Sequence, residues 1–222
     1  MITTAPELIY MLKVNIGIAL FYAFYKLFCC RDTFFQWRRI ALLSFLALSF
    51  LYPLMDMQAW VKEQPAINEL ADYYALMMLT ETNTSTATVV TAPVAIPTPD
   101  LLDIIKFVYW IGILLLSARF MIQLSSIFRL VLKSKNINVD QISIRSLSEP
   151  ANPFSFWQWI FIYLPGLKED EKQEILTHEQ THVRQWHSID VIISEIVNII
   201  CWMNPFAWLL KTEIRLNLEY LA

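Results

Sequence analysis

The sequence has little charge for its length. Only 17% of its 222 residues are Asp, Glu, Lys or Arg, whereas 56% are hydrophobic. Soluble chains contain roughly 45–50% apolar residues, and the mean hydropathy of this chain is +0.44. The 17 basic and 20 acidic residues give a net charge of −3, so no overall positive field attracts a nucleic-acid backbone. A purely soluble domain and a direct nucleic-acid partner are therefore both disfavoured.

Glycine and cysteine are also scarce. The three glycines stand at widely separated positions, so the sequence has no glycine-rich loop of the kind that surrounds a phosphate group. Of the three cysteines, Cys29 and Cys30 are adjacent and Cys201 lies inside an apolar run. This set provides neither the even disulfide framework of a small secreted protein nor a CxxC metal site.

Long apolar runs predict three membrane spans. They cover about residues 8–28, 40–55 and 101–124, and a spanning helix needs about 20 residues. The lysines and arginines near the ends of the first and third runs have side chains long enough to reach the interface. We therefore expect a transmembrane domain over residues 1–124. Within it, residues 56–100 are expected to form a flexible outer loop, because the stretch 80–99 is rich in Thr and Pro and low in charge.

The distribution of Lys and Arg predicts the orientation. No Lys or Arg precedes the first span, and only Lys62 lies between the second and third. Four lie at or between the facing ends of the first two spans, and five lie at or soon after the end of the third: Lys26, Arg31, Arg38 and Arg39, and Arg119, Arg129, Lys133, Lys135 and Arg145. Cytoplasmic segments have the positive excess. We expect a multi-pass protein of the inner (cytoplasmic) membrane, with its N-terminus outside and residues 125–222 on the cytoplasmic side. Residues 1–7 lack the basic start and the cleavage site of a signal peptide, so the first helix is expected to remain as an anchor.

Beyond residue 124 the pattern predicts a small α+β domain over residues 125–222. Residues 125–135 continue as a basic amphipathic helix, and residues 141–147 alternate apolar and polar side chains with the period of a strand. Residues 154–164 are rich in aromatic and β-branched side chains. They predict one or two further strands, with an interfacial membrane segment as the alternative.

A helix from Asp170 carries the motif HEQTH, which comprises His178, Glu179 and His182. Four residues along a helix turn about 400°, so the two imidazoles lie one turn apart on one face and can bind one metal ion. Glu179 lies between them and can act on a metal-bound water without being a ligand. The alternative is a surface helix that happens to carry two histidines, but all three histidines of the chain lie between positions 178 and 187.

The remaining histidine, His187, is not expected to be the third ligand. It follows His182 by five residues, which places it about 140° away around a continuous helix. The HExxHxxGxxH class is rejected because positions 185 and 188 are Gln and Ser. We expect His187 to support the ligands, to cap the next helix or to face the substrate.

An apolar helix is predicted over residues 188–203. Ser188 is a suitable N-terminal cap for it. Glu195 and Asn198 stand one turn apart in the apolar part of this helix, and we expect them to form a buried hydrogen-bonded pair.

The third ligand is expected from the chain that follows this helix. Asn204-Pro205 breaks the long apolar stretch in the middle and leaves two arms, each about 24–26 Å long at the helical rise. A single crossing would leave the last helix on the wrong side of the membrane, whereas a hairpin returns it to the level of His178. Glu219 is then within reach of the histidines. Glu213 lies one or two turns farther away, as a solvated charge.

Two segments resemble the membrane-embedded zinc metallopeptidases of the BlaR/MecR antirepressor type. They are HEQTHVRQWHSID and WMNPFAWLLKTEIRLNLEYLA, and they follow several N-terminal spans. The resemblance implies a gluzincin-like fold with a re-entrant or membrane-associated helical hairpin, Zn²⁺ bound by His178, His182 and Glu219, and Glu179 as the catalytic base. Family members often have Asp where this chain has His187. They usually continue past EYLA, so a peptidase domain shortened at its C-terminus is also expected.

These observations predict a zinc-dependent endopeptidase in a transmembrane signalling pathway. Glu179 would take a proton from the zinc-activated water and pass it to the leaving amine. Tyr220, Arg215 and His187 are the candidates for stabilising the oxyanion. The resemblance implies a cytoplasmic protein substrate, such as a transcriptional repressor or the peptidase itself. The lipid bilayer is the other expected partner, and a homodimer is left open. The alternatives are a catalytically silent signalling or scaffold protein with structural zinc, and a membrane anchor for a domain absent from this chain.

Overall fold

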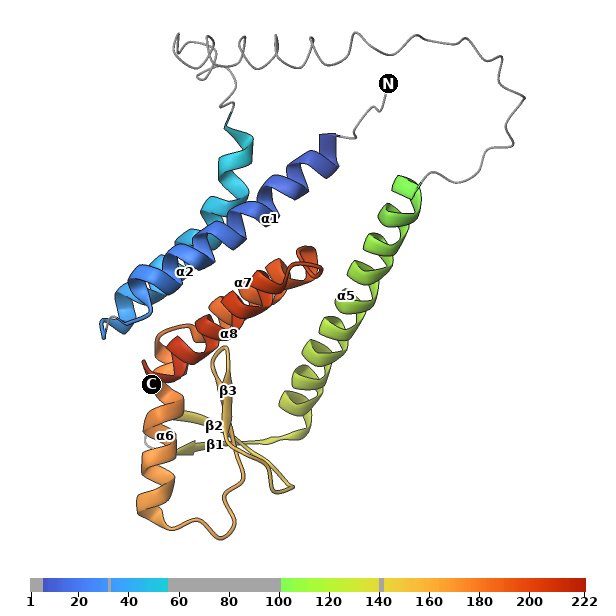
Figure 1. Ribbon diagram of the computed structural model, residues 1–222. Helices are drawn as coiled ribbons and strands as arrows, with labels where there is room; N and C mark the ends of the chain where they lie inside the picture. Colours follow the sequence, from blue (N-terminus) through green and yellow to red (C-terminus); the bar gives the residue numbers. More distant parts are fainter. Residues whose placement is uncertain (1–5, 32, 56–100, 140–141) are drawn as a thin grey trace, which may run out of the picture.

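The computed structural model describes residues 6–31, 33–55, 101–139 and 142–222. Within these ranges the chain is mostly helical and carries one small sheet (Figure 1). The expected outer loop, residues 56–100, lies outside the described residues.

Three described helices are long and apolar enough to cross a membrane, and they extend over Glu7–Cys29, Phe35–Leu54 and Leu101–Lys133. The first consists of α1 (Pro6–Phe24) and a π-helical turn, Tyr25–Cys29. The second consists of α2 (Phe35–Leu51) and a 3₁₀ turn, Tyr52–Leu54. The third is α5 (Leu101–Lys133). A helix long and apolar enough to span a membrane is therefore found at each of the three predicted places. Helix α5 continues through residue 124, where the sequence suggested a change of domain.

The first two candidate spans form an antiparallel pair, and α5 stands apart from them (Figure 1). The pair is joined by stacked rings of Phe21 and Phe45, whose centroids lie 5.4 Å apart, and by a hydrogen bond from Tyr10 to the carbonyl of Phe50. No side chain of α5 is buried.

The sheet has four strands in the order β1-β2-β4-β3. The strands are β1 (Lys135–Val139), β2 (Ile142–Ser146), β3 (Phe154–Phe156) and β4 (Trp159–Ile162). β1 was not predicted. The sequence indicated a helix through residue 135, whereas α5 ends at Lys133 and the strand begins at Lys135. The strand prediction for residues 154–164 is confirmed, and the interfacial alternative is wrong. β2 pairs with β4 in parallel, while the outer strands β1 and β3 pair antiparallel.

Three helices complete the described chain: α6 (Glu169–Arg184), α7 (His187–Ile200) and α8 (Pro205–Glu219). Asn204 ends the connection between α7 and α8, and its side chain accepts a hydrogen bond from the backbone N–H of Phe206. Pro205 follows at the first helical position, where its missing N–H costs nothing. The chain break predicted at Asn204-Pro205 is therefore observed, and α7 and α8 pack side by side (Figure 1).

The tip of this helix pair packs between α1 and α5. Val14 and Ile18 of α1 form a buried cluster with Cys201 and Ala207. On the other side, Tyr109 of α5 donates a hydrogen bond to the carbonyl of Ile200. Helix α5 has glycine at position 112, where a Cβ atom would overlap the ring of Trp202. This glycine allows α5 to approach the tip closely.

Candidate metal centre

Helix α6 carries the HExxH motif and is fixed on the sheet by its apolar face. Leu176 is buried in a cluster with Ile144, Ile160 and Ile162 of β2 and β4. Glu171 accepts a hydrogen bond from the backbone N–H of Lys168 and so satisfies one free donor at the helix start. The sheet therefore determines the position of the turn that bears His178, Glu179 and His182.

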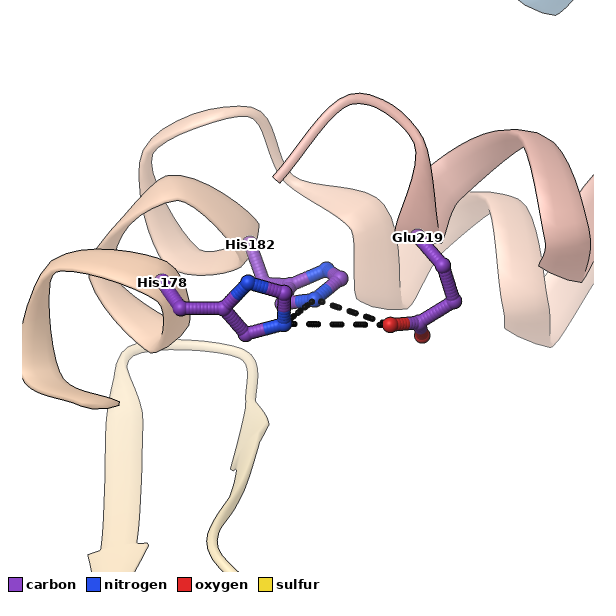
Figure 2. A group of neighbouring side chains, drawn as sticks. All are labelled: His178, His182 and Glu219. Atoms are coloured by element: carbon purple, nitrogen blue, oxygen red, sulfur yellow. Dashed lines mark hydrogen bonds and ion pairs between the residues drawn. The ribbon is translucent and has the colours of Figure 1, made fainter. Parts of the chain in front are cut away.

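His178, His182 and Glu219 meet although they belong to helices far apart in the sequence (Figure 2). The two Nε2 atoms of the histidines are 3.3 Å apart. Glu219 Oε2 lies 3.7 Å from His178 Nε2 and 3.8 Å from His182 Nε2. The structure thus brings together the three residues that the sequence singled out as ligands.

The triangle formed by these three atoms matches the size of a zinc ion. The point equidistant from them lies about 2.1 Å from each atom, and Zn–N and Zn–O bonds are about 2.0–2.2 Å long. Two imidazoles and one carboxylate are also the donor set of a catalytic zinc site, which leaves a position for water. No other cluster of three such side chains occurs among the residues the structure describes.

Glu219 is positioned by contacts between α8 and the ends of the first two spans. The ring of Tyr220 stacks on Phe35 of α2 at a centroid distance of 5.1 Å, and Asn217 donates a hydrogen bond to the carbonyl of Phe35. One turn before Asn217, Glu213 forms an ion pair with Lys26, with 2.7 Å between Nζ of the lysine and Oε1 of the glutamate. The prediction that Glu213 is a solvated charge is wrong, because its side chain is only 15% exposed.

Glu213 is also linked to α2 through a buried arginine. Arg38 donates a hydrogen bond to the Tyr25 hydroxyl, which in turn donates to Glu213. The arginine nitrogen lies 4.0 Å from Glu213 Oε2. Residues from both spans therefore hold α8 in place two turns before the proposed ligand.

His187 lies against His182, contrary to the expectation for a continuous helix. Helix α6 ends at Arg184, and Trp186 adopts a left-handed conformation with φ of 58°. The resulting turn places His187 at the start of α7 with its Nδ1 atom 2.6 Å from Nδ1 of His182. Of the three roles expected for His187, the geometry supports contact with a ligand residue.

This contact determines which nitrogen of His182 carries the proton. His187 Nε2 lies 3.2 Å from the side-chain oxygen of Gln185, which can only accept, so His187 donates from Nε2 and accepts at Nδ1. His182 must then donate from its own Nδ1. Its Nε2 lone pair is left free and faces His178 and Glu219, as metal ligation requires.

The turn between α6 and α7 is held by α2. Arg39 donates to Asp190 over 2.6 Å and to the backbone carbonyl of Gln185 over 2.8 Å, and Gln36 donates to the Gln185 side chain. Asp190 is buried, so Arg39 supplies its opposite charge. Sequence reasoning missed Gln36, Arg39 and Gln185, because nothing in their local pattern indicates contacts about 150 residues away along the chain.

Burial favours the neutral form of His182 and of His187. Burial lowers the pKa of His182, and the nearby Glu219 carboxylate partly opposes this shift. The pKa of His187 is lowered to about 4 by burial, with smaller contributions from His182 and Arg39. Neutral imidazole is the form that binds metal, so the lowered pKa of His182 favours the form that ligation requires.

A cleft of about 470 Å³ opens in front of the three ligand atoms. Glu179 lines this cleft and is only 7% exposed. Of the three oxyanion candidates, Arg215 and His187 line the cleft. Tyr220 is absent from its lining and stacks on Phe35 instead. The cleft therefore contains a carboxylate, a cation and the potential metal ligands.

Two further predictions for α7 are wrong. The side chain of Ser188 does not cap the helix; its hydroxyl accepts a hydrogen bond from the backbone N–H of Trp157. Glu195 and Asn198 do not form a pair, since Glu195 binds Lys211 and Arg215 of α8. Both errors arise because the true partners come from other elements.

Comparison with known protein families agrees with this geometry. The family model described as BlaR1 peptidase M56 matches residues 11–222, which includes two candidate spans in full, the sheet and all three ligand residues. No curated protein matches the chain. Since the family match covers nearly the whole sequence, the chain belongs to the BlaR1 peptidase M56 family of membrane metallopeptidases.

Proposed function

We propose that this protein is a zinc-dependent endopeptidase. The single observation that carries the proposal is the triangle of His178, His182 and Glu219, whose dimensions suit zinc, next to the buried Glu179. A zinc ion held by these three residues would lower the pKa of a bound water toward about 7 and would polarise the scissile carbonyl. These are the requirements for hydrolysing a peptide bond.

Glu179 is the proposed general base and acid. It takes a proton from the attacking water and returns it to the leaving amine, a role that suits a carboxylate lining the cleft beside the ligands. Arg215 is the favoured residue for stabilising the oxyanion. Both ring nitrogens of His187 already have partners. Arg215 binds Glu195 through one nitrogen, but a guanidinium has five N–H donors, and its half-exposed side chain lines the cleft.

Strand β3 is the proposed binding edge for the substrate. It is the strand at one edge of the sheet, and its three residues, Phe154, Ser155 and Phe156, all line the cleft. A peptide in extended conformation can pair with such an edge through backbone hydrogen bonds. The aromatic side chains of β3 would then contact alternate residues of the substrate.

The site is proposed to face the cytoplasm from a gluzincin-like domain. The α7–α8 pair, whose tip reaches α1 and α5, is proposed to be a re-entrant hairpin of the inner membrane. The N-terminus is placed outside by the distribution of Lys and Arg. The proposed substrate is accordingly a cytoplasmic protein, either a transcriptional repressor or the peptidase itself.

Helix α2 offers a route for a signal from outside to the metal site. Its first turns contact α8 through Phe35 and Arg38 and contact the α6–α7 turn through Gln36 and Arg39. Any movement of α2 therefore displaces the elements that carry Glu219 and His187. We propose that transmembrane signalling acts on the peptidase in this way.

The test uses the full chain, purified in detergent and loaded with zinc. Zinc content is measured by mass spectrometry, and cleavage is measured with casein and with quenched fluorescent peptides. We expect Glu179→Gln to retain zinc and to lose about 10²–10⁴-fold in rate. Glu174→Gln, a change at an exposed position on the same helix, is the control and should retain both. Zinc binding without cleavage by the unchanged protein would favour the silent scaffold instead.

A further inference from the structure

A second cavity, of about 140 Å³, lies between α5, α7 and α8. Its polar lining comes from six side chains: Arg119, Gln123, Glu195, Asn198, Lys211 and Arg215. Three apolar residues, Leu116, Phe120 and Ile199, complete the wall toward α5 and α7. Apart from Arg215, none of these residues lines the metal cleft.

The cavity has an excess of positive charge. Lys211 and Arg215 both contact Glu195, at 2.7 and 2.6 Å, so one carboxylate serves two cations. Arg119 forms no ion pair with another described residue. The three cations and one anion leave an excess of two positive charges, two of the cations being exposed, and this excess favours an anionic group.

An unsatisfied acceptor lies in the same wall. Asn198 is 3% exposed, and its side-chain oxygen has no hydrogen-bond partner within the described part of the chain. A buried acceptor without a donor costs about 1–3 kcal/mol. A ligand that brings a hydrogen-bond donor in addition to a negative charge would satisfy this oxygen.

The surroundings of the cavity are those of a membrane interface. Arg119 lies near the end of the apolar run of α5, and Trp208 of α8 lines the cavity with its ring 5.4 Å from the Lys211 ammonium. Tryptophan and long cationic side chains gather at the level of lipid headgroups. The α5 surface next to the cavity exposes Leu115 and Ile122, against which an acyl chain can lie.

We infer that this cavity binds the headgroup of a phospholipid that carries both a phosphodiester and a primary ammonium group, as phosphatidylethanolamine does. The phosphate oxygens accept hydrogen bonds from Arg119, Lys211 and Arg215. The ammonium group donates to Glu195 and to the free oxygen of Asn198. Such a ligand supplies both the negative charge and the donor that the cavity lacks.

The position of Arg215 gives this site a consequence for catalysis. Arg215 lines both the second cavity and the metal cleft, and it is one helical turn from Glu219. A phosphate that binds Arg215 competes with the cleft for the same guanidinium. Lipid occupancy is therefore expected to alter cleavage, a consequence that rests on the proposed function, whereas lipid binding itself does not.

The test measures retained lipid on the full chain by native mass spectrometry after titration with phosphatidylethanolamine, phosphatidylcholine, phosphatidylglycerol or diacylglycerol. We expect retention to be strongest for phosphatidylethanolamine. Arg119→Gln should weaken it about tenfold, the effect of losing one charge-assisted hydrogen bond. The control is Arg129→Gln, an exposed arginine farther along α5 that does not line the cavity, which should leave retention unchanged.

Three results would overturn the inference. They are equal retention of diacylglycerol, equal retention of phosphatidylglycerol, and equal effects of the two arginine substitutions. Displacement of the lipid by millimolar inorganic phosphate alone would show that the cavity is an anion site without selectivity for a headgroup. The melting temperature of each variant in detergent reports on folding whether or not zinc is bound, so loss of lipid binding by a folded variant is distinguishable from failure of the proposed peptidase activity.

Discussion

The hydrogen bond between His182 and His187 gives the most discriminating test of the metal centre. His187→Ala removes the acceptor 2.6 Å from His182 Nδ1 and leaves a void, since His187 is 3% exposed. The His182 ring then loses the contact that fixes its orientation and its protonated nitrogen. Removing a residue that orients a metal-bound histidine costs about 10–100-fold in metal affinity, which corresponds to about 1.4–2.7 kcal/mol.

The matched substitution is His187→Asn. Its side-chain oxygen can occupy roughly the position of Nδ1 and accept the same hydrogen bond, so most of the affinity should return. The assay is competition for zinc with a chromophoric chelator, using the full chain in detergent near neutral pH. If both variants bind zinc as tightly as the unchanged protein, His187 does not orient His182 and the tautomer argument fails. If both variants lose the same zinc affinity, the loss is due to altered packing and not to the missing hydrogen bond.

Three further predictions concern the charges and contacts around the site. Arg39→Met should lower the free energy of unfolding by about 3 kcal/mol, because it leaves the buried Asp190 carboxylate without its cation; thermal melting in detergent measures this loss. Gly112→Leu should destabilise the protein by about 1–3 kcal/mol, since the new side chain overlaps the Trp202 ring; the same melting assay applies. Glu219→Gln should weaken zinc binding by more than about 100-fold, beyond the loss from a residue that only supports a ligand; chelator competition measures it.

Each of these variants has a control at an exposed position. Arg31→Met and Ala118→Leu make the same kinds of change away from the buried contacts. Both variants should have the melting temperature of the unchanged protein. Glu174→Gln changes a carboxylate on α6 at an exposed position and should retain full zinc affinity. If a control variant shows the same loss as the variant with which it is paired, the loss is due to the detergent or to general destabilisation.

The meeting of His178, His182 and Glu219 was predictable because their positions follow from regular geometry. The spacing of His178 and His182 is set by the helical period. Glu219 follows from two helical arms of similar length around Asn204-Pro205, which return the chain to its starting level. Such arguments need only a helix and a break, and both are encoded by neighbouring residues.

The position of His187 was not predictable in the same way. The argument from a continuous helix failed at Trp186, which adopts φ of 58° without being glycine. A bulky residue in that conformation is held there by tertiary contacts. Here the Trp186 ring packs edge-on against Trp157 of the β3–β4 turn, with centroids 5.1 Å apart. The local sequence carries no signal of that contact.

The charged residues show the same limit. Glu213 was predicted to be a solvated charge and Glu195 to pair with Asn198, yet each carboxylate contacts two cations from other parts of the chain. Their partners lie 16 to 187 residues away along the chain. Periodicity finds the face that a helix buries, but it cannot identify the opposite charge that makes burial of a carboxylate tolerable.

The division of the ligands between two helices explains why so many polar contacts gather at the start of α2. His178 and His182 are fixed by the packing of α6 on the sheet, whereas Glu219 lies at the end of α8, which packs on the first two spans. Nothing within either unit alone sets the distance between them. Arg39 holds the α6–α7 turn, and Phe35 and Arg38 hold α8. These residues lie within five consecutive positions of one helix, so α2, together with α7, which packs on both α6 and α8, helps to set the spacing of the three candidate ligands.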